Sequence, residues 1–234
     1  MNGAGSGERG LRIPVWGVAI VLIAAIFTAS LYLRLQTGAG LDVRYCALAA
    51  FFSVNLLICY WEACLLWRHG VVVRRAPHWA ERAGGGASVA AAFLTAQVPL
   101  RKTLSTELWA DVWAMYSVYD DSYTDRGSFG FNVDIGNGLV TAIPSVLLLA
   151  TYTSPFLPAV VAGIIGVAVF WQWLYCTSVY VSSFFLAGRH RRIGRKDMYL
   201  YFLAPNFPWL LASILGLYTS VRLVLDGNYA VLGF

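Results

Sequence analysis

Two carboxylates lie inside otherwise apolar stretches of the chain. Glu62 stands in NLLICYWEACLLW and Asp134 in FGFNVDIGNGLVTAIP. Acidic side chains are costly within a bilayer, and those that are kept there usually serve a function. A carboxyl group that stays protonated in a dry site can give its proton to a weak base such as an alkene, and a second carboxyl group can hold the returning proton. We therefore interpret Glu62 and Asp134 as candidate catalytic residues for proton transfer.

Aromatic and amide side chains accompany these acids. The chain has nine Trp, 13 Tyr and 13 Phe residues, more than interfacial belts alone require. Because aromatic faces attract cations, such side chains can stabilise a carbocation formed by protonation. We expect Asn206 to orient an acid or the intermediate. The candidate substrate-binding residues are Asn55, Trp61, Tyr116, Tyr119, Tyr180, Asn206 and Trp209.

Each acid also has a purely structural interpretation. Glu62 could reach the membrane interface or pair with an arginine across the bundle, and Asp134 could cap the start of its helix. The acidic run Asp120, Asp121 and Asp125 is typical of a solvated loop. These alternatives stay open at the level of sequence.

The composition is that of an integral membrane protein. Hydrophobic residues make up 59% of the 234 residues and charged residues 12%, whereas soluble domains have about 45–50% and about 25%. The four cysteines lie in apolar stretches without a CxxC pair, and the three histidines lie among arginines in polar connections. We therefore expect neither a metal site nor a cofactor.

Five stretches are long enough to cross a bilayer, which takes about 20 apolar residues. The first is longer than the apolar core of a secretory signal, so it is interpreted as a retained helix. We predict an all-α membrane protein, a single domain over 1–234 with a five-helix bundle. The predicted spans are 13–33, 45–67, 129–152, 157–187 and 198–225.

Basic residues predict the orientation of these spans. They gather in the second connection and, as GRHRRIGRKD, in the fourth, so the positive-inside rule makes both connections and the N-terminus cytoplasmic. Arg34 and Arg44 fall on the other side, against the rule. In this orientation Glu62 and Asp134 both lie roughly 8 Å inside the cytoplasmic boundary, five residues from their helix ends. The Ala-, Gly- and Arg-rich usage favours a bacterial plasma membrane, with the endoplasmic reticulum as the alternative.

The long second connection is expected to stay at the interface. Its segment 84–100 is apolar but glycine-rich and short, which favours a re-entrant or interfacial course over a sixth span. The next segment predicts a helix with Trp109, Trp113 and Tyr116 on one face and Glu107 and Asp111 on another. That helix could lie along the interface or close a pocket from the cytoplasmic side.

Four stretches together resemble the emopamil-binding protein (EXPERA) superfamily, which includes a sterol Δ8–Δ7 isomerase and a sigma-2-type receptor. They are YWEACLLW, then VYDDSY followed by Asp134 and Pro144, then VYVSSFFLAGRHR and YLYFLAPNFPWLL. The resemblance implies a five-helix fold with a ligand cavity and an acid-assisted double-bond shift. The positions that match the superfamily's motifs are Tyr119, Asp120, Ser122, Tyr123, Asp134, Asn206 and Trp209.

The chain departs from that pattern at two positions. Ile58 stands where the isomerase has a histidine one turn before its glutamate, and the second acid is an aspartate rather than a glutamate. A similarity to small membrane terpene cyclases rests on Asn55 and the pair Trp61-Glu62. It implies protonation of a prenyl alkene or epoxide by membrane acids.

The sequence therefore predicts a membrane isomerase, a terpene cyclase acting on a lipophilic isoprenoid. One alternative is a sterol double-bond isomerase, and another is a non-catalytic protein that binds sterols, lipids or amines. The expected partners are an isoprenoid or sterol-like substrate and membrane lipids, with a homodimer as a possibility and no nucleic acid. Proton-coupled transport is disfavoured because the five spans show no internal repeat.

Overall fold

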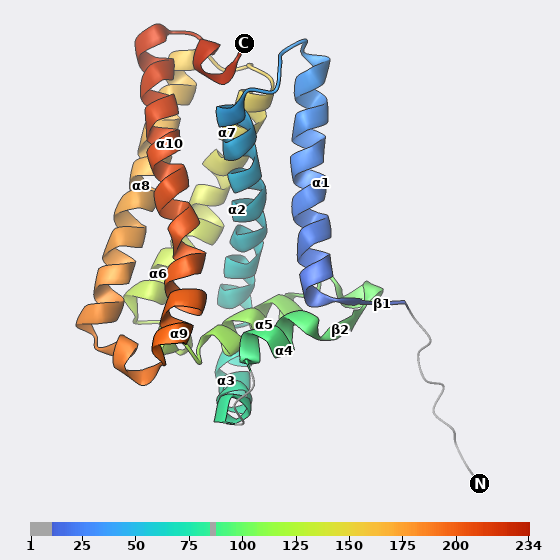
Figure 1. Ribbon diagram of the computed structural model, residues 1–234, viewed down its shortest axis with the longest axis vertical. Coiled ribbons are helices and arrows are strands. Elements are labelled where there is room, and N and C mark those ends of the chain that lie inside the picture. The colour runs from blue at the N-terminus through green and yellow to red at the C-terminus, as the bar shows by residue number, and fades with distance from the viewer. Residues whose placement is uncertain (1–10, 85–87) are drawn as a thin grey trace.

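Five long helical segments form the body of the protein (Figure 1). The computed structural model describes residues 11–84 and 88–234. Each predicted span is confirmed to within a few residues, and their length and composition make the chain an integral membrane protein. The spans are α1 (Val15–Gln36), α2 (Val43–Trp67), the segment Phe129–Thr153, α8 (Ala159–Leu186) and the segment Arg195–Asp226.

Spans three and five are not continuous α-helices. Each contains a π-helical turn, in which the backbone takes a wider path than in an α-helix. The third span consists of α6 (Phe129–Gly136), the π-turn η3 (Asn137–Thr141) and α7 (Ala142–Thr153). The fifth consists of α9 (Arg195–Asp197), the π-turn η5 (Met198–Leu203) and α10 (Ala204–Asp226).

Capping residues in the sequence set several of the helix ends. Asp42 accepts from the backbone N–H of Arg44 at 2.8 Å and so begins α2. Ser128 does the same for α6. Gly188 and Gly227 follow α8 and α10 with φ near +69° and +65°, a left-handed conformation that favours glycine.

Small residues bring α8 and α10 close together, as is common between membrane helices. A Cβ atom on Gly163 would lie 2.7 Å from the carbonyl oxygen of Ser220, and one on Gly216 would lie 2.3 Å from the ring of Phe170. On the other side of α2 lies α1, which is mostly lipid-facing (Figure 1). The central helix α2 is therefore the most buried span and the natural carrier of polar side chains.

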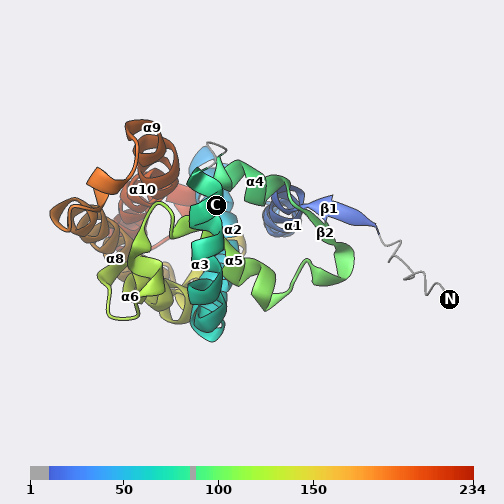
Figure 2. The same cartoon turned by 90° about the horizontal axis from the view of Figure 1, so that it is seen from below.

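Short elements lie across one end of the bundle, opposite the C-terminus (Figures 1 and 2). Strands β1 and β2 form an antiparallel pair that ties the start of α1 to the second connection. These elements are β1 (Arg12–Pro14), α3 (His69–Gly84), α4 (Val89–Thr95), β2 (Gln97–Pro99), η1 (Leu100–Lys102) and α5 (Thr106–Tyr116). The described part of segment 84–100 is thus a short helix and a strand, and residues 85–87 lie outside the described residues. The helix α3 was not predicted from the sequence.

Three short 3-10 turns complete the described elements. They are η2 (Asp121–Thr124), η4 (Arg189–Arg192) and η6 (Ala230–Leu232). At the opposite end of the bundle, Arg34 is completely buried and donates to the carbonyl groups of Gly40 and Tyr152, both at 2.8 Å, and to that of Leu232. Arg44 forms an ion pair with Asp42 at 3.0 Å. Both arginines that break the positive-inside rule therefore have local structural partners.

Candidate active site

A cavity of about 330 Å³ lies between α5 and the neighbouring halves of the spans. Its walls are largely aromatic, and its volume is near the lower limit for small-molecule sites. Because α5 supplies Trp113 and Tyr116 to the wall, this helix closes the cavity. Seven of the nine predicted site residues line it: Trp61, Tyr116, Tyr119, Asp134, Tyr180, Asn206 and Trp209.

Aromatic contacts hold this wall in place. Trp61 of α2 stacks on Trp109 of α5 with ring centroids 5.0 Å apart, and Trp113 Nε1 donates to the carbonyl group of Trp61 at 2.8 Å. Tyr119 stacks on Tyr201 at 4.6 Å. The face of α5 predicted to be aromatic therefore packs on α2. Asp111, which was expected on the opposite face, is also buried.

Asp111 illustrates why α5 is held on both faces. Trp79 of α3 donates to its carboxylate at 2.9 Å, and Arg75 of α3 lies 3.2 Å from the same oxygen. Burial raises the pKa of Asp111, and these two partners oppose the rise. Asp111 is buried because the helix α3, which was not predicted, covers the face of α5 that carries it.

Asp134 faces the cavity rather than the end of its helix. Ser128 is the N-cap of α6, since its Oγ accepts from the backbone N–H of Phe131 at 3.2 Å. The capping interpretation of Asp134 is therefore wrong. The carboxyl group is half-buried because the cavity reaches it, and the hydroxyl group of Tyr123 lies against it.

Glu62 lies behind the cavity wall. Its side chain is 3% exposed, and its Oε2 accepts from Nδ2 of Asn137 at 2.8 Å. None of the ion pairs within the described residues involves it. The structure thus contradicts both structural alternatives for Glu62, an interfacial position and an arginine partner. The two acids are close enough that the charge of Asp134 acts on Glu62.

Asn137 joins Glu62 to the helices around it. Its Nδ2 donates to Glu62 and, at 3.2 Å, to Oδ1 of Asn55. Its Oδ1 accepts from Trp173 Nε1 at 2.8 Å and from Thr141 Oγ1 at 2.6 Å. Asn55 is completely buried behind Asn137 and does not line the cavity. Asn55 therefore contacts the side-chain amide of Asn137, and not the space where a substrate was predicted to bind.

The π-turns place both asparagines of the site. Asn137 begins η3, and Asn206 follows η5 by three residues. Gly138 lies so close to α2 that a Cβ atom there would be 2.7 Å from Cβ of Glu62. Asn206 donates to the carbonyl group of Phe202 at 2.7 Å, and the hydroxyl group of Tyr116 lies beside its side chain. The role of Asn206 toward an acid or an intermediate stays a prediction.

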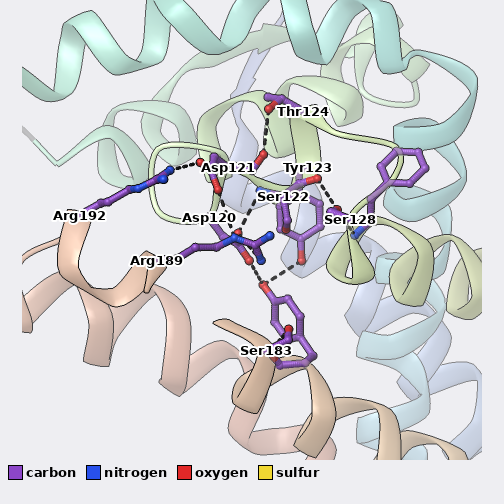
Figure 3. A network of polar contacts seen from close by, with 11 residues as sticks. Asp120, Asp121, Ser122, Tyr123, Thr124, Ser128, Ser183, Arg189 and Arg192 are labelled. Carbon is purple, nitrogen blue, oxygen red and sulfur yellow. Dashed lines mark hydrogen bonds and ion pairs between the residues drawn. The ribbon is translucent and has the colours of Figure 1, made fainter. Parts of the chain in front are cut away.

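A second polar network lies in the loop before α6 and includes Asp120 and Tyr123 (Figure 3). Tyr123 donates to the hydroxyl oxygen of Tyr180 at 3.2 Å, and Tyr180 donates to Oδ2 of Asp120 at 2.7 Å. Arg189 of η4 lies 3.4 Å from Oδ1 of Asp120. Asp120 is only 1% exposed, so its assignment to a solvated loop is wrong.

The phenols outside the spans are held neutral. Burial raises the pKa of Tyr119 to about 12 and places the pKa values of Tyr116 and Tyr123 higher still above their ordinary value. The nearby charges of Asp120 and Asp134 act in the same direction on Tyr116 and Tyr123. These hydroxyl groups therefore act as hydrogen-bond donors and acceptors, and not as bases.

Four residues at this site were not among the predicted ones: Asn137, Trp173, Tyr123 and Asp120. Asn137 had a signal, because it stands three residues after Asp134 and so could share its face. Trp173 had none, since it is one of several aromatic residues in its helix. For Asp120 and Tyr123, the only signal in the sequence was their position in the VYDDSY motif.

Comparison with known protein families finds no match, and no curated protein matches the sequence. Among the residues that the structure describes, no group of three His, Cys, Asp or Glu side chains is arranged to hold a metal ion. Function is therefore inferred from the geometry of the cavity and its acids.

Proposed function

We propose that this protein is an integral membrane isomerase or cyclase that protonates an alkene or epoxide of a lipophilic isoprenoid. The observation that carries the proposal is a carboxyl group, that of Asp134, in the wall of an aromatic cavity between membrane spans. Such a cavity admits an apolar chain from the bilayer. It also offers that chain a proton and aromatic faces for the positive charge that follows.

The proposed reaction conserves every atom. The proton of Asp134 forms a new C–H bond with an alkene carbon, or opens an epoxide C–O bond after protonating its oxygen. The π electrons of a second alkene then form a C–C bond to the cationic carbon and close a ring, which moves the charge to the other alkene carbon, or the cation rearranges directly. Loss of a proton from the neighbouring carbon forms the product alkene and returns the proton to a carboxylate of the site.

The two acids take different parts in this scheme. Asp134 faces the cavity and is the catalytic acid. Glu62 lies behind Asn137 and is a positioning residue. The two carboxyl groups are close enough to interact, so they do not ionise independently.

Two other functions use the same geometry. Sterol double-bond isomerisation needs the same acid, but Ile58 lines the cavity where that family has its histidine. Non-catalytic binding of a cationic amine is favoured by the same carboxylate and aromatic rings. Sterol isomerisation and amine binding can be distinguished from isoprenoid cyclisation by measuring which substrate, if any, the protein converts.

The test is turnover in heavy water. Purified protein in lipid nanodiscs is incubated in D2O with prenylated and epoxidised acceptors, and in parallel with a zymosterol-type sterol. We expect a cyclised product that carries deuterium at the protonated carbon, because the acid exchanges with solvent. Product from the sterol alone would assign the isomerase instead.

The variant Asp134→Asn should lower the rate by about 10² to 10⁴, the usual contribution of a general acid. The matched control is Asp121→Asn, an aspartate of the neighbouring loop with a half-exposed side chain, which should leave the rate unchanged. Retained turnover in Asp134→Asn overturns the proposal. Tight binding of a lipophilic amine without turnover of either substrate class would assign the binding protein.

A further inference from the structure

Two polar side chains of α8 line the cavity without a hydrogen-bond partner. They are Gln172, which is half-buried near the middle of the span, and Thr177, which is buried with 8% of its surface exposed. Within residues 11–84 and 88–234, no group forms a hydrogen bond with either side chain. A polar group without a partner is costly at membrane depth. Both side chains are therefore free to bind a polar group of a ligand.

The neighbouring hydroxyl groups of α8 show that Thr177 is set apart. A serine or threonine in a helix commonly donates to the carbonyl group four residues earlier. Ser178 donates in this way to Leu174 at 2.7 Å, and Ser182 donates to Ser178 at 2.8 Å, and both serines are exposed. Thr177 makes no such bond to any described residue. Its hydroxyl group is left for the cavity that the side chain lines.

Other polar groups of the cavity wall already bind one another. A side-chain amide can donate two hydrogen bonds and accept two, and Asn137 makes all four within the protein. Tyr180 has one proton and donates it to Asp120 at 2.7 Å. These groups hold the wall together, whereas Gln172 and Thr177 offer donors and acceptors to the molecule that fills the cavity.

Spans three and four run antiparallel, and two contacts show how they lie along each other. A Cβ atom on Gly130 would lie 2.9 Å from the ring of Tyr180. Asn137, seven residues after Gly130, accepts from Nε1 of Trp173, seven residues before Tyr180. The two spans therefore advance in step between these contacts. Asp134, four residues after Gly130, is level with the position four residues before Tyr180.

This alignment places the two free side chains relative to the proposed catalytic acid. Thr177 is one residue from the level of Asp134, so it lines the cavity at nearly the same depth. Gln172 lies about one helical turn farther into the bilayer, roughly 6 Å at 1.5 Å for each residue. A substrate that reacts at Asp134 would meet Thr177 near its reacting end and Gln172 farther along its chain.

We propose that Gln172 and Thr177 bind oxygen atoms of the substrate, so that the site selects an oxygenated isoprenoid over a hydrocarbon of the same skeleton. An epoxide oxygen can accept from either side chain, and a hydroxyl group can also donate. A site built to form hydrogen bonds disfavours a ligand that lacks the matching group, because its own polar atoms stay unpaired. The isoprenoid skeleton rests on the proposed function, whereas the preference for oxygen rests on the two free side chains.

The experiment measures the binding of three probes that share one carbon skeleton: β-farnesene, its 10,11-epoxide and farnesol. The purified full chain in lipid nanodiscs is titrated with each probe. Binding is followed by intrinsic tryptophan fluorescence, because the cavity is lined by Trp61, Trp113, Trp173 and Trp209. We expect the parent protein to bind at least one oxygenated probe about tenfold more tightly than β-farnesene.

The variants Thr177→Val and Gln172→Leu remove the hydrogen-bonding groups and keep side chains of similar size. Each should weaken binding of the preferred oxygenated probe about threefold to tenfold, the usual range for one neutral hydrogen bond, and leave β-farnesene unchanged. The double variant should bind the three probes alike, and Thr177→Ser should bind them like the parent. Ser178→Ala is the matched control, because its hydroxyl group is exposed and bonds to Leu174, and it should change nothing.

Equal binding of the three probes by the parent protein, or no binding of any of them, overturns the inference, as does an oxygen preference that survives in the double variant. The two proposals fail separately. Oxygen-selective binding that needs Gln172 and Thr177, without turnover of any probe, supports the inference and removes the isomerase. Turnover that depends on Asp134 but shows no preference for oxygen does the reverse.

Discussion

The substitution Asn137→Ala tests the hydrogen bonds by which the Asn137 amide holds Glu62 and its neighbours. It removes the amide that Glu62, Asn55 and Trp173 share, whereas Thr141 keeps a bond to the backbone carbonyl group of residue 137 at 3.0 Å. Three buried polar groups lose their partner. At about 1 kcal/mol for each, the free energy of unfolding should fall by about 3 kcal/mol.

The hydrogen bond to Glu62 can be separated from the rest by a double-mutant cycle. The cycle combines Asn137→Ala with Glu62→Ala, and unfolding is followed by SDS titration in mixed micelles. A hydrogen bond to a charged group contributes about 1.5–3 kcal/mol, while neutral pairs between membrane helices average about 0.6 kcal/mol. We expect a coupling energy of about 0.6 kcal/mol or more, because this hydrogen bond is buried between two membrane spans.

The matched control is Asn132→Ala, five residues earlier on the same span. Its amide donates to the carbonyl groups of Arg126 and Ser128, both at 2.8 Å, but the residue is exposed. It should cost less than about 1 kcal/mol. Equal stability of Asn137→Ala and Asn132→Ala, or a coupling energy near zero with Glu62, would refute the reasoning.

Three further predictions concern packing and charge. Gly138→Ala should destabilise the protein by about 1–3 kcal/mol through overpacking, because its Cβ would lie 3.0 Å from backbone atoms of α2, and its melting temperature in detergent should fall. Gly136→Ala is the control: the space around Gly136 is open, so this variant should melt like the parent. Arg34→Lys should cost about 2 kcal/mol, since one ammonium group cannot reach three carbonyl groups at once, and an unchanged melting temperature would contradict this. Asp42→Ala should cost about 1 kcal/mol at neutral pH by loss of the N-cap of α2. Hydrogen bonding and ion pairing with Arg44 lower the pKa of Asp42, so its stabilisation is present above the unfolded pKa of about 4 and is lost as pH falls through the folded value. Melting curves of Asp42→Ala and the parent should therefore converge in acid, and a difference that persists there would argue against the cap.

The sequence alone was sufficient for the spans and for the pairing of the acids. A spanning segment is recognised by a local property, about 20 apolar residues in a row, because the bilayer leaves the backbone few alternatives to a helix. The similar depth of Glu62 and Asp134 also follows from local quantities, the helix rise and the antiparallel course of two neighbouring spans. The aromatic face of α5 follows from helical periodicity in the same way.

Only the tertiary structure decided which way these side chains point. The π-turn at Asn137 alters the rotation of everything that follows it, so an ideal helical wheel does not show that Asn137 contacts Glu62. The sequence assigns Asp120 to a solvated loop, but η4 brings Arg189 against it in the folded chain. It places Asp111 on a second face of its helix, but does not show that α3 covers that face. Burial of a polar side chain depends on partners from distant parts of the chain, whereas apolar periodicity does not. The two lone acids were therefore visible from the start, but their different surroundings, the amide of Asn137 for Glu62 and the cavity with the phenol of Tyr123 for Asp134, exist only in the folded bundle.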